Sequence, residues 1–389
     1  MTRSLAVPLL FSLTLAGAAR GQFGGSGADG ALQPTGNIVL DTSGRPAGWS
    51  FTTIDIPWGV VVRLQGSNPA ILRCTGSVSI QGGLIADGFA ASGASPGAGG
   101  PGGYPGGQPG QVGGGPAGGR AGSMAGGWWF PAGPGGHSSY YGNARPFDLR
   151  GGSGGGGATY NGPLYGQYGG HGGGGVVVLL ADGDITVQFS GAVTANGGGG
   201  SGSDNAPGAG GGVLIRSASS VAVLGTVSAA GGPPPSSYFL RGDDGFVRMD
   251  AWGDLPDIRG ALSIAPPATL LALPSLASTT PMLGSTWVHA VASLPNDTVF
   301  VAFSLGTATI NLGNLGVLGI DPYGGIVTLG SAVVPPIFPF GADLDAAIYV
   351  AVPASPIYAG LALHTQAIAL LTTSPSGPRL SNVVHGVVQ

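Results

Sequence analysis

The sequence contains no lysine and no glutamate, because all 13 basic residues are arginine and all 17 acidic residues are aspartate. Lys and Glu are among the commonest helix-forming residues, so their absence, together with 80 glycines and 32 prolines, argues against helices almost everywhere. Short runs of Val, Ile and Thr predict strands instead. Charged residues make up only 8% of the chain, and no basic cluster is present to neutralise phosphates, which excludes nucleic acid as a partner.

The chain has one cysteine, Cys74, and therefore no internal disulfide. Burial and hydrogen bonding must hold such a chain together. Cys74 ends the apolar stretch AILRC, and no neighbouring residue would lower the pKa of its thiol. We interpret it as a small buried strand residue rather than as a nucleophile.

Long hydrophobic runs are also scarce. A basic residue followed by the apolar run 5–15 is typical of a signal peptide, which we place at residues 1–21, with cleavage before Gln22 or before Ala19. This run is too short to span a bilayer, and the apolar stretch 261–277 is interrupted by prolines. We therefore expect an exported chain, secreted or at the cell surface, without a transmembrane segment.

What the sequence does contain is a repeat. The segment 213–231 aligns to 70–88 without a gap, and 177–197 fits the same frame with two residues added at Phe189 and Ser190. Together with a weaker copy and an opening turn, the units lie at residues 51–69, 70–88, 177–197, 213–231 and 246–265.

Each unit holds short strand-like triplets with alternate apolar positions, separated by glycine or other small residues. A unit of about twenty residues with several short strands is typical of one coil of a parallel β-helix, whose inner face is buried only when coils stack. The sequence thus predicts an all-β protein with a short parallel β-solenoid over 51–265. Because the end of such a stack is an open edge, we predict that residues 22–50 form an N-terminal cap.

Long glycine-rich excursions separate the units. The largest is predicted at 89–175, and 35 glycines lie among residues 93–175. Shorter excursions span 198–212 and 232–245. Glycine at this density indicates either a disordered linker or a compact loop collapsed onto the solenoid, and the aromatic residues of the loop favour the second. Those aromatics would either pack on the solenoid or offer stacking faces to sugars.

From residue 266 the composition changes, because glycine becomes rarer and longer strand patterns appear. These patterns predict an antiparallel β-sandwich over 266–389. The glycine-rich coils with the pattern V-x-I-x-G-x-(V/L)-x-A-x-G, followed by VPASPIYAGLALHTQAIALL and a closing SN strand, resemble exported glycine-rich β-solenoid proteins of environmental bacteria. That resemblance implies export and a surface or extracellular role, and it brings no catalytic residues.

The sequence contains two short strings that match hydrolase motifs. His171 opens an HGGG string like the oxyanion loop of esterases, and Gly-x-Ser-x-Gly surrounds Ser95 and Ser153. A nucleophile elbow needs a strand before the serine and a helix after it, and both serines lie inside glycine tracts. We therefore interpret the stretch around His171 as the place where the chain returns from an excursion. A phosphate-binding P-loop is excluded because it requires lysine.

Carbohydrate chemistry is the remaining catalytic hypothesis, because parallel β-helices often host polysaccharide lyases and hydrolases. The candidate acids are Asp182, Asp184, Asp243 and Asp244, with Arg241 as the candidate base. Asp-Gly and Gly-Asp pairs are also ordinary turn residues, and we favour that interpretation. The five histidines show no metal-ligand spacing, so we predict no metal and no cofactor.

The leading hypothesis is a non-enzymatic structural, surface or adhesive protein. Neutral glycine-rich loops on a stiff β stack suit weak multivalent contact better than turnover. The alternative is a carbohydrate-active or carbohydrate-binding β-helix protein. In both cases the expected partner is an extracellular polysaccharide or the cell-surface matrix.

Overall fold

The computed structural model describes residues 25–125, 128–136, 150–159, 166–199, 205–234, 240–293, 297–334, 346–370 and 378–389. These residues confirm the predicted all-β class, with 44% strand and 2% helix. The helical residues form two short 3-10 turns, Gly313–Leu315 and Pro356–Tyr358. In this part of the chain no helix has the length and apolar character that a bilayer crossing requires. The predicted signal peptide lies outside the described residues.

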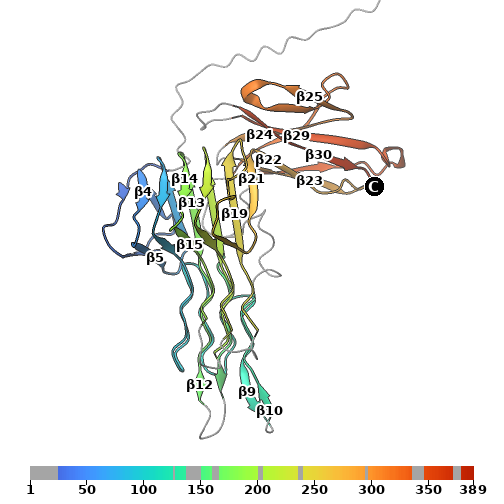
Figure 1. Cartoon of the computed structure of the whole chain (residues 1–389). Helices are drawn as coiled ribbons and strands as arrows, with labels where there is room; N and C mark the ends of the chain where they lie inside the picture. Colours follow the sequence, from blue (N-terminus) through green and yellow to red (C-terminus); the bar gives the residue numbers. More distant parts are fainter. Residues whose placement is uncertain are drawn as a thin grey trace, which may run out of the picture.

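Three parallel sheets make up the N-terminal part of the molecule (Figure 1). The first contains, in spatial order, β1 (Ala31–Leu32), β4 (Thr53–Ile56), β7 (Val78–Ile80), β14 (Ile185–Val187) and β17 (Val221–Val223). The second contains β2 (Ile38–Asp41), β5 (Val61–Gln65), β8 (Gly83–Ile85), β15 (Ala192–Thr194), β18 (Thr226–Ser228) and β20 (Ser263–Ala265). The third contains β3 (Trp49–Phe51), β6 (Ala70–Cys74), β13 (Val176–Ala181), β16 (Gly212–Ser217), β19 (Phe246–Trp252) and β21 (Thr269–Leu273).

The register of these strands matches the repeat in the sequence. Val177 pairs with Ala70 on one side and with Val213 on the other, as the alignment requires. The units stay aligned after the extra Phe189 and Ser190, because Val193 still pairs with Leu84 and Val227. The two added residues therefore lengthen one corner without shifting the strands.

Alternate residues of the three parallel sheets point inward and form one apolar core. Leu72, Leu179 and Ile215 stack on neighbouring strands of the third sheet and are fully buried. Each such Leu or Ile contributes about 1.5–3 kcal/mol when it leaves water. Cys74 lies on the same inner face, and burial raises the pKa of its thiol, in agreement with its interpretation as a strand residue.

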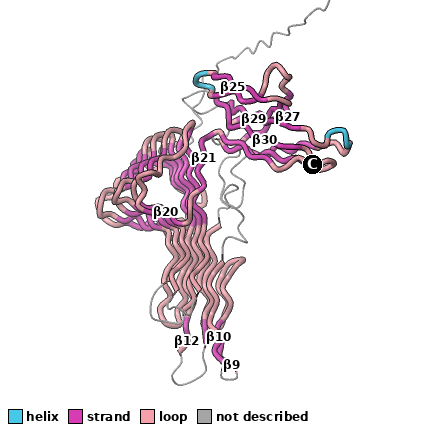
Figure 2. Tube along the Cα trace, turned by 45° about the vertical axis from the view of Figure 1, so that its right-hand side comes forward, coloured by secondary structure: helices cyan, strands magenta, loops and turns pink. Residues whose placement is uncertain are grey.

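The described parts of the glycine-rich excursions are ordered, and they do not lie collapsed on the sheets. In the described residues they run as extended segments, side by side, away from the ends of the parallel strands (Figure 2). We call the described parts of the excursions 89–175, 198–212 and 232–245 the glycine bundle. At its far end lies a small sheet with the order β10-β9-β11-β12 (Figure 1). Its strands are β9 (Gly122–Ala125), β10 (Trp128–Phe130), β11 (Ala158–Thr159) and β12 (Gln167–Tyr168).

The C-terminal part consists of antiparallel sheets. One contains β22 (Ser275–Ser278), β23 (Thr286–Ala292) and β28 (Ala346–Ala351). The second has the order β27 (Val327–Val333), β24 (Thr298–Ser304), β29 (Ala362–Leu370) and β30 (Arg379–Val387). A two-stranded ribbon pairs β25 (Thr307–Asn311) with β26 (Val317–Ile320).

The parallel part extends further than the predicted boundary at residue 266. Strand β21 pairs in parallel with β19, so the third parallel sheet continues to Leu273. The prolines at 266 and 267 lie in the corner before this strand and do not end the stack. The antiparallel pairing of the C-terminal part starts after Pro274, where β22 joins β23.

The outer face of the third parallel sheet packs against the antiparallel part, and this contact includes a buried ion cluster. Asp250 accepts hydrogen bonds from Nε of Arg216 at 2.8 Å and from Nε of Arg248 at 2.9 Å. Burial alone would raise the pKa of Asp250, but the two guanidinium charges outweigh it and lower that pKa. Arg216 also donates to the carbonyl of Ser293 at 3.1 Å, which ties the two parts together.

Candidate functional site

The segment around His171 lies in the interior of the glycine bundle. Successive backbone N–H groups donate in turn to three neighbouring segments, so that every third residue donates to the same segment. Residues 169, 172 and 175 donate to carbonyls of residues 93, 89 and 86; residues 170, 173 and 176 donate to 107, 104 and 101; residues 171 and 174 donate to 206 and 209. A repeat of three residues per turn is that of a polyproline II helix, here in glycine.

The carbonyls of the same segment accept from further neighbours. Those of Gly170 and Gly173 accept from the N–H groups of Gly97 and Gly100. Those of residues 171 and 174 accept from residues 155 and 152. The backbone of this segment is therefore hydrogen-bonded outward in several directions, directly to the backbones of its neighbours.

Close approach explains why these positions are glycine. A Cβ added to Gly170 would lie 1.9 Å from the carbonyl oxygen of Gly155, and one added to Gly173 would lie 1.9 Å from that of Gly152. Real Cβ atoms do not approach a carbonyl oxygen so closely. The tract is thus a packing requirement, and its N–H groups are already donated, so none is free to stabilise an oxyanion.

The His171 side chain is buried in the bundle. Its Nδ1 accepts a hydrogen bond from the N–H of Ala91 at 2.9 Å, and burial lowers the pKa of the imidazole to about 4. Ser153 is buried in a neighbouring glycine segment, where its Oγ accepts from the N–H of Ala117 at 3.2 Å. Neither serine motif lies on a strand-to-helix turn, since Ser95 is in a short turn with Ser92.

Asp182 and Asp184 follow strand β13 at a corner of the parallel sheets. Asp184 accepts from the hydroxyls of Ser219 and Ser220, both at 2.7 Å. These hydroxyl hydrogen bonds lower the pKa of its carboxyl. The carboxylate links the corners of two successive units, as a turn residue does.

Arg241, Asp243 and Asp244 lie at the opposite ends of the strands, where the chain leaves the bundle to enter β19. Asp244 pairs with Arg241 and also accepts from the N–H of Gly231 at 2.9 Å. Because Gly212 of β16 pairs with both Val176 and Phe246, a strand of six residues separates this group from Asp182. That strand spans about 20 Å, well beyond the separation of a glycosidase carboxylate pair.

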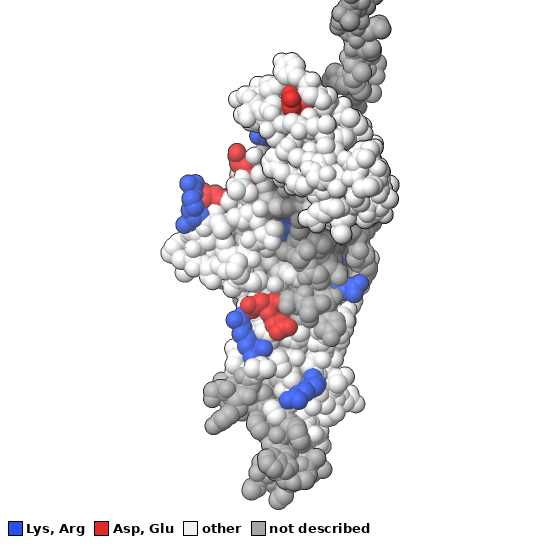
Figure 3. Space-filling model, turned by 90° about the vertical axis from the view of Figure 1, so that its right-hand side faces the viewer, with Lys and Arg blue, Asp and Glu red and all other residues white. Residues whose placement is uncertain are grey.

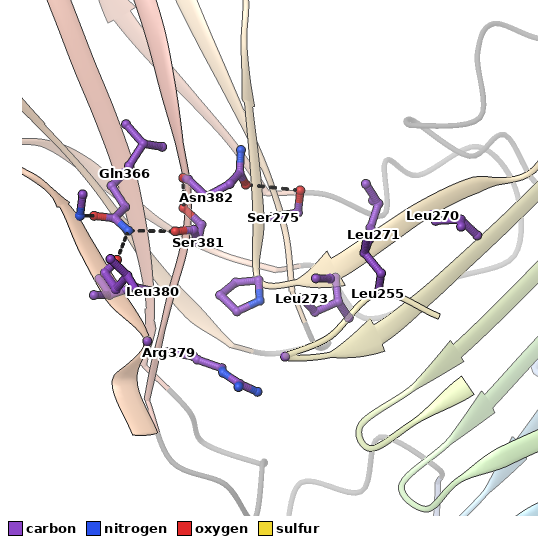
Figure 4. Close-up of a pocket in the computed structure, with 17 residues that line it drawn as sticks. Leu255, Leu270, Leu271, Leu273, Ser275, Gln366, Arg379, Leu380, Ser381 and Asn382 are labelled. Carbon is purple, nitrogen blue, oxygen red and sulfur yellow. Dashed lines mark hydrogen bonds between the residues drawn. The ribbon is translucent and has the colours of Figure 1, made fainter. Parts of the chain in front are cut away.

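A groove between the parallel and antiparallel parts is the strongest candidate for a binding site. It has a volume of about 500 Å³ and lies between β21 on one side and β30 on the other (Figure 4). Its walls carry apolar side chains from the parallel part, among them Leu255, Leu271 and Leu273, and polar side chains from the antiparallel part. The polar members are Ser275, Gln366, Arg379, Ser381 and Asn382.

Arg379 differs from the other polar residues of this junction groove. Gln366 and Asn382 use both ends of their amides on backbone groups within the protein. The Arg379 guanidinium lies 5.9 Å from the centroid of the Trp252 ring and has no hydrogen-bond or ion-pair partner among the described residues. It is therefore a cation available to an anionic group in the groove.

Sequence reasoning did not single out Arg379. One signal was available, because Arg379 is the only basic residue after Arg259 in the printed sequence. The groove itself is formed by residues more than a hundred positions apart, so no local pattern marks it. In the part of the chain that the structure describes, no group of three or more His, Cys, Asp or Glu side chains is placed to hold a metal ion.

Comparison with known proteins gave no match to a family model, to a curated protein or to a solved structure.

Proposed function

We propose that this chain is an exported, non-enzymatic surface or adhesive protein. In this proposal the three parallel sheets form a short β-solenoid, the antiparallel part is a β-sandwich, and the glycine bundle is a stiff spacer. The spacer carries the β9–β12 sheet away from the rest of the molecule, toward an extracellular polysaccharide or the cell-surface matrix.

The three-way hydrogen bonding of residues 169–176 carries the proposal. A bundle in which every chain is bonded to neighbours in several directions resists bending, whereas a glycine-rich linker would not. Its interior offers no side-chain chemistry apart from buried groups such as His171. This is the construction of a spacer rather than of a catalytic centre.

The surface supports the same role. On the face shown in Figure 3, charged groups occur in small separate clusters on a largely neutral surface. Of the candidate acids, Asp184 binds the neighbouring corner and Asp244 pairs with Arg241. A neutral surface of this kind favours contact with neutral or weakly charged polymers over electrostatic capture.

Incubation of the purified mature protein with insoluble and soluble polysaccharides tests the proposal. We expect retention on one or more insoluble polymers without release of reducing or unsaturated ends. Replacement of Trp128 and Trp129 by alanine changes β10, an edge strand of the small sheet, and should reduce that retention. Release of sugar ends that disappears in an Asp243→Ala/Asp244→Ala variant would contradict the proposal and establish an enzyme.

The junction groove favours a second candidate function, a carbohydrate-binding module. A guanidinium without an internal partner, beside apolar walls, suits the carboxylate of a uronic acid. Binding of a polyuronate, but not of a neutral glucan, should then fall at least tenfold in Arg379→Gln. Arg259→Gln removes the same charge from an exposed ion pair and is the matched control. If both variants lost the same amount of polyuronate binding, the effect would come from the net charge of the protein and not from the groove.

A further inference from the structure

Two histidines that lie 21 positions apart in the sequence meet on the antiparallel sheet. His364 of β29 and His385 of β30 are direct cross-strand partners. Their Nδ1 atoms are 2.6 Å apart, and the two rings meet edge to face with centroids separated by 4.8 Å. The histidine spacing in the sequence gave no hint of this contact.

The contact is a pair of ligand atoms facing each other. Each Nδ1 carries a lone pair unless it is protonated, so a proton must lie between the two nitrogens for them to be this close. A neutral imidazole is the form that binds transition metals.

The His364–His385 pair is accessible to solvent and is held by regular strands. His385 is exposed and His364 is half-buried, so an ion can arrive from solvent. Both residues lie within regular strands of a four-stranded sheet, which fixes their backbones. Ser304 of β24 is the next partner of His364 in the same row, and its hydroxyl donates to the carbonyl of Asp321 at 2.9 Å. Neither histidine has a carboxylate partner among the described residues.

We propose that His364 and His385 bind one divalent transition-metal ion through their Nδ1 atoms, with water completing the coordination. Metal–nitrogen bonds of about 2.0–2.1 Å place two cis nitrogens roughly 3 Å apart, so the rings must separate by about half an ångström and turn their Nδ1 lone pairs toward the ion. Imidazole ligands select Cu²⁺, Ni²⁺ and Zn²⁺ over Ca²⁺ and Mg²⁺, which prefer oxygen. The metal takes the place of the shared proton, which moves to Nε2 of its own ring when both imidazoles are neutral and leaves to solvent when one of them is protonated.

Calorimetric titration of the full mature chain, produced without a polyhistidine tag, tests this site. We expect one equivalent of Cu²⁺ or Zn²⁺ to bind, Cu²⁺ more tightly, and Mg²⁺ not to bind. His364→Gln and His385→Gln should each weaken binding at least tenfold. His137→Gln removes a histidine from elsewhere in the sequence and should leave the affinity unchanged.

A second measurement separates metal binding from a loss of fold. The ring NMR signals of His364 and His385 should shift or broaden with Zn²⁺, while those of the buried His171 and His289 should not. The metal should also raise the unfolding temperature of the unaltered protein but not of His385→Gln. No saturable binding, or binding that survives in both single variants, would overturn the proposal.

Discussion

The parallel sheets and the glycine bundle satisfy the same backbone groups in different ways. In β13, residues 176–181 hydrogen-bond to β6 and β16, which lie in one sheet, and side chains fill the space above and below it. In residues 169–175, directly before β13, the hydrogen bonds point around the whole chain and no side chain is needed. The parallel sheets are stabilised by packed side chains. In the glycine bundle the backbones approach so closely that a Cβ atom would not fit at most positions.

This difference predicts opposite responses to mutation. A sheet position loses stability when its side chain becomes smaller, because a cavity opens. A bundle position loses stability when a side chain appears at all, because neighbouring carbonyl groups must move apart. Four substitutions or conditions test the contrast, ordered from the largest expected effect.

Leu179→Ala should produce the largest loss. The Leu179 side chain is fully buried between Leu72 and Ile215 on the neighbouring strands. We expect the free energy of unfolding to fall by about 2–5 kcal/mol, measured by denaturant titration. A change below 1 kcal/mol would mean that the inner face is not a packed core.

Gly173→Ala should destabilise the bundle by about 1–3 kcal/mol, since the added Cβ would lie 1.9 Å from the carbonyl oxygen of Gly152. The matched control is Gly36→Ala, where a Cβ would meet no atom within 4 Å. The control should be neutral or slightly stabilising in the same thermal and denaturant measurements. Equal behaviour of the two variants would show that the bundle is not close-packed.

Acid should weaken the fold through its buried histidines. Burial lowers the pKa of His171 from 6.5 to about 4. Between these values the unfolded chain takes up a proton that the folded chain refuses, so stability is complete above pH 6.5 and falls toward pH 4. We expect a loss of about 1–3 kcal/mol from this residue.

The measurement is the difference in unfolding free energy between pH 7.5 and pH 4.5. That difference should shrink in His171→Gln, whatever the variant does to stability at neutral pH. Burial gives His289 of the antiparallel part the same pKa of about 4, so His289→Gln should remove a comparable share. An unchanged pH difference in His171→Gln would contradict the assignment.

Asp244→Asn should have the smallest effect. The Arg241–Asp244 pair is on the surface of the bundle, with side chains 50% and 40% exposed, and such pairs contribute at most about 1 kcal/mol. The asparagine oxygen can still accept from the N–H of Gly231, so that contact is kept. A loss of several kcal/mol in thermal unfolding would show that the bundle depends on this ion pair.

The parallel sheets were largely predictable from sequence, because their inward residues repeat. Val177 and Val213 pair as the alignment required, and the position of the two-residue insertion was also correct. The bundle was not predictable in the same way. Its order depends on contacts between segments such as 97–107 and 169–175, and glycine leaves no side-chain pattern from which to infer them.

The candidate sites depend on tertiary contacts for a similar reason. Arg379 reaches the junction groove only because β30 lies beside the end of the parallel part. His364 and His385 meet through the register of β29 and β30, which a difference of 21 positions does not reveal. Local sequence patterns predict the strands, whereas the candidate sites form only where distant strands pair.

The hydrogen bonding of residues 169–176 has a consequence for amide exchange. An amide exchanges with solvent only when its hydrogen bond opens, and a chain bonded to several neighbours opens only when the whole group separates. The slowest-exchanging amides of the bundle should therefore belong to a stretch of almost pure glycine. In deuterium-labelling data, the part of the sequence that most resembles a flexible linker would then be among the last to become labelled.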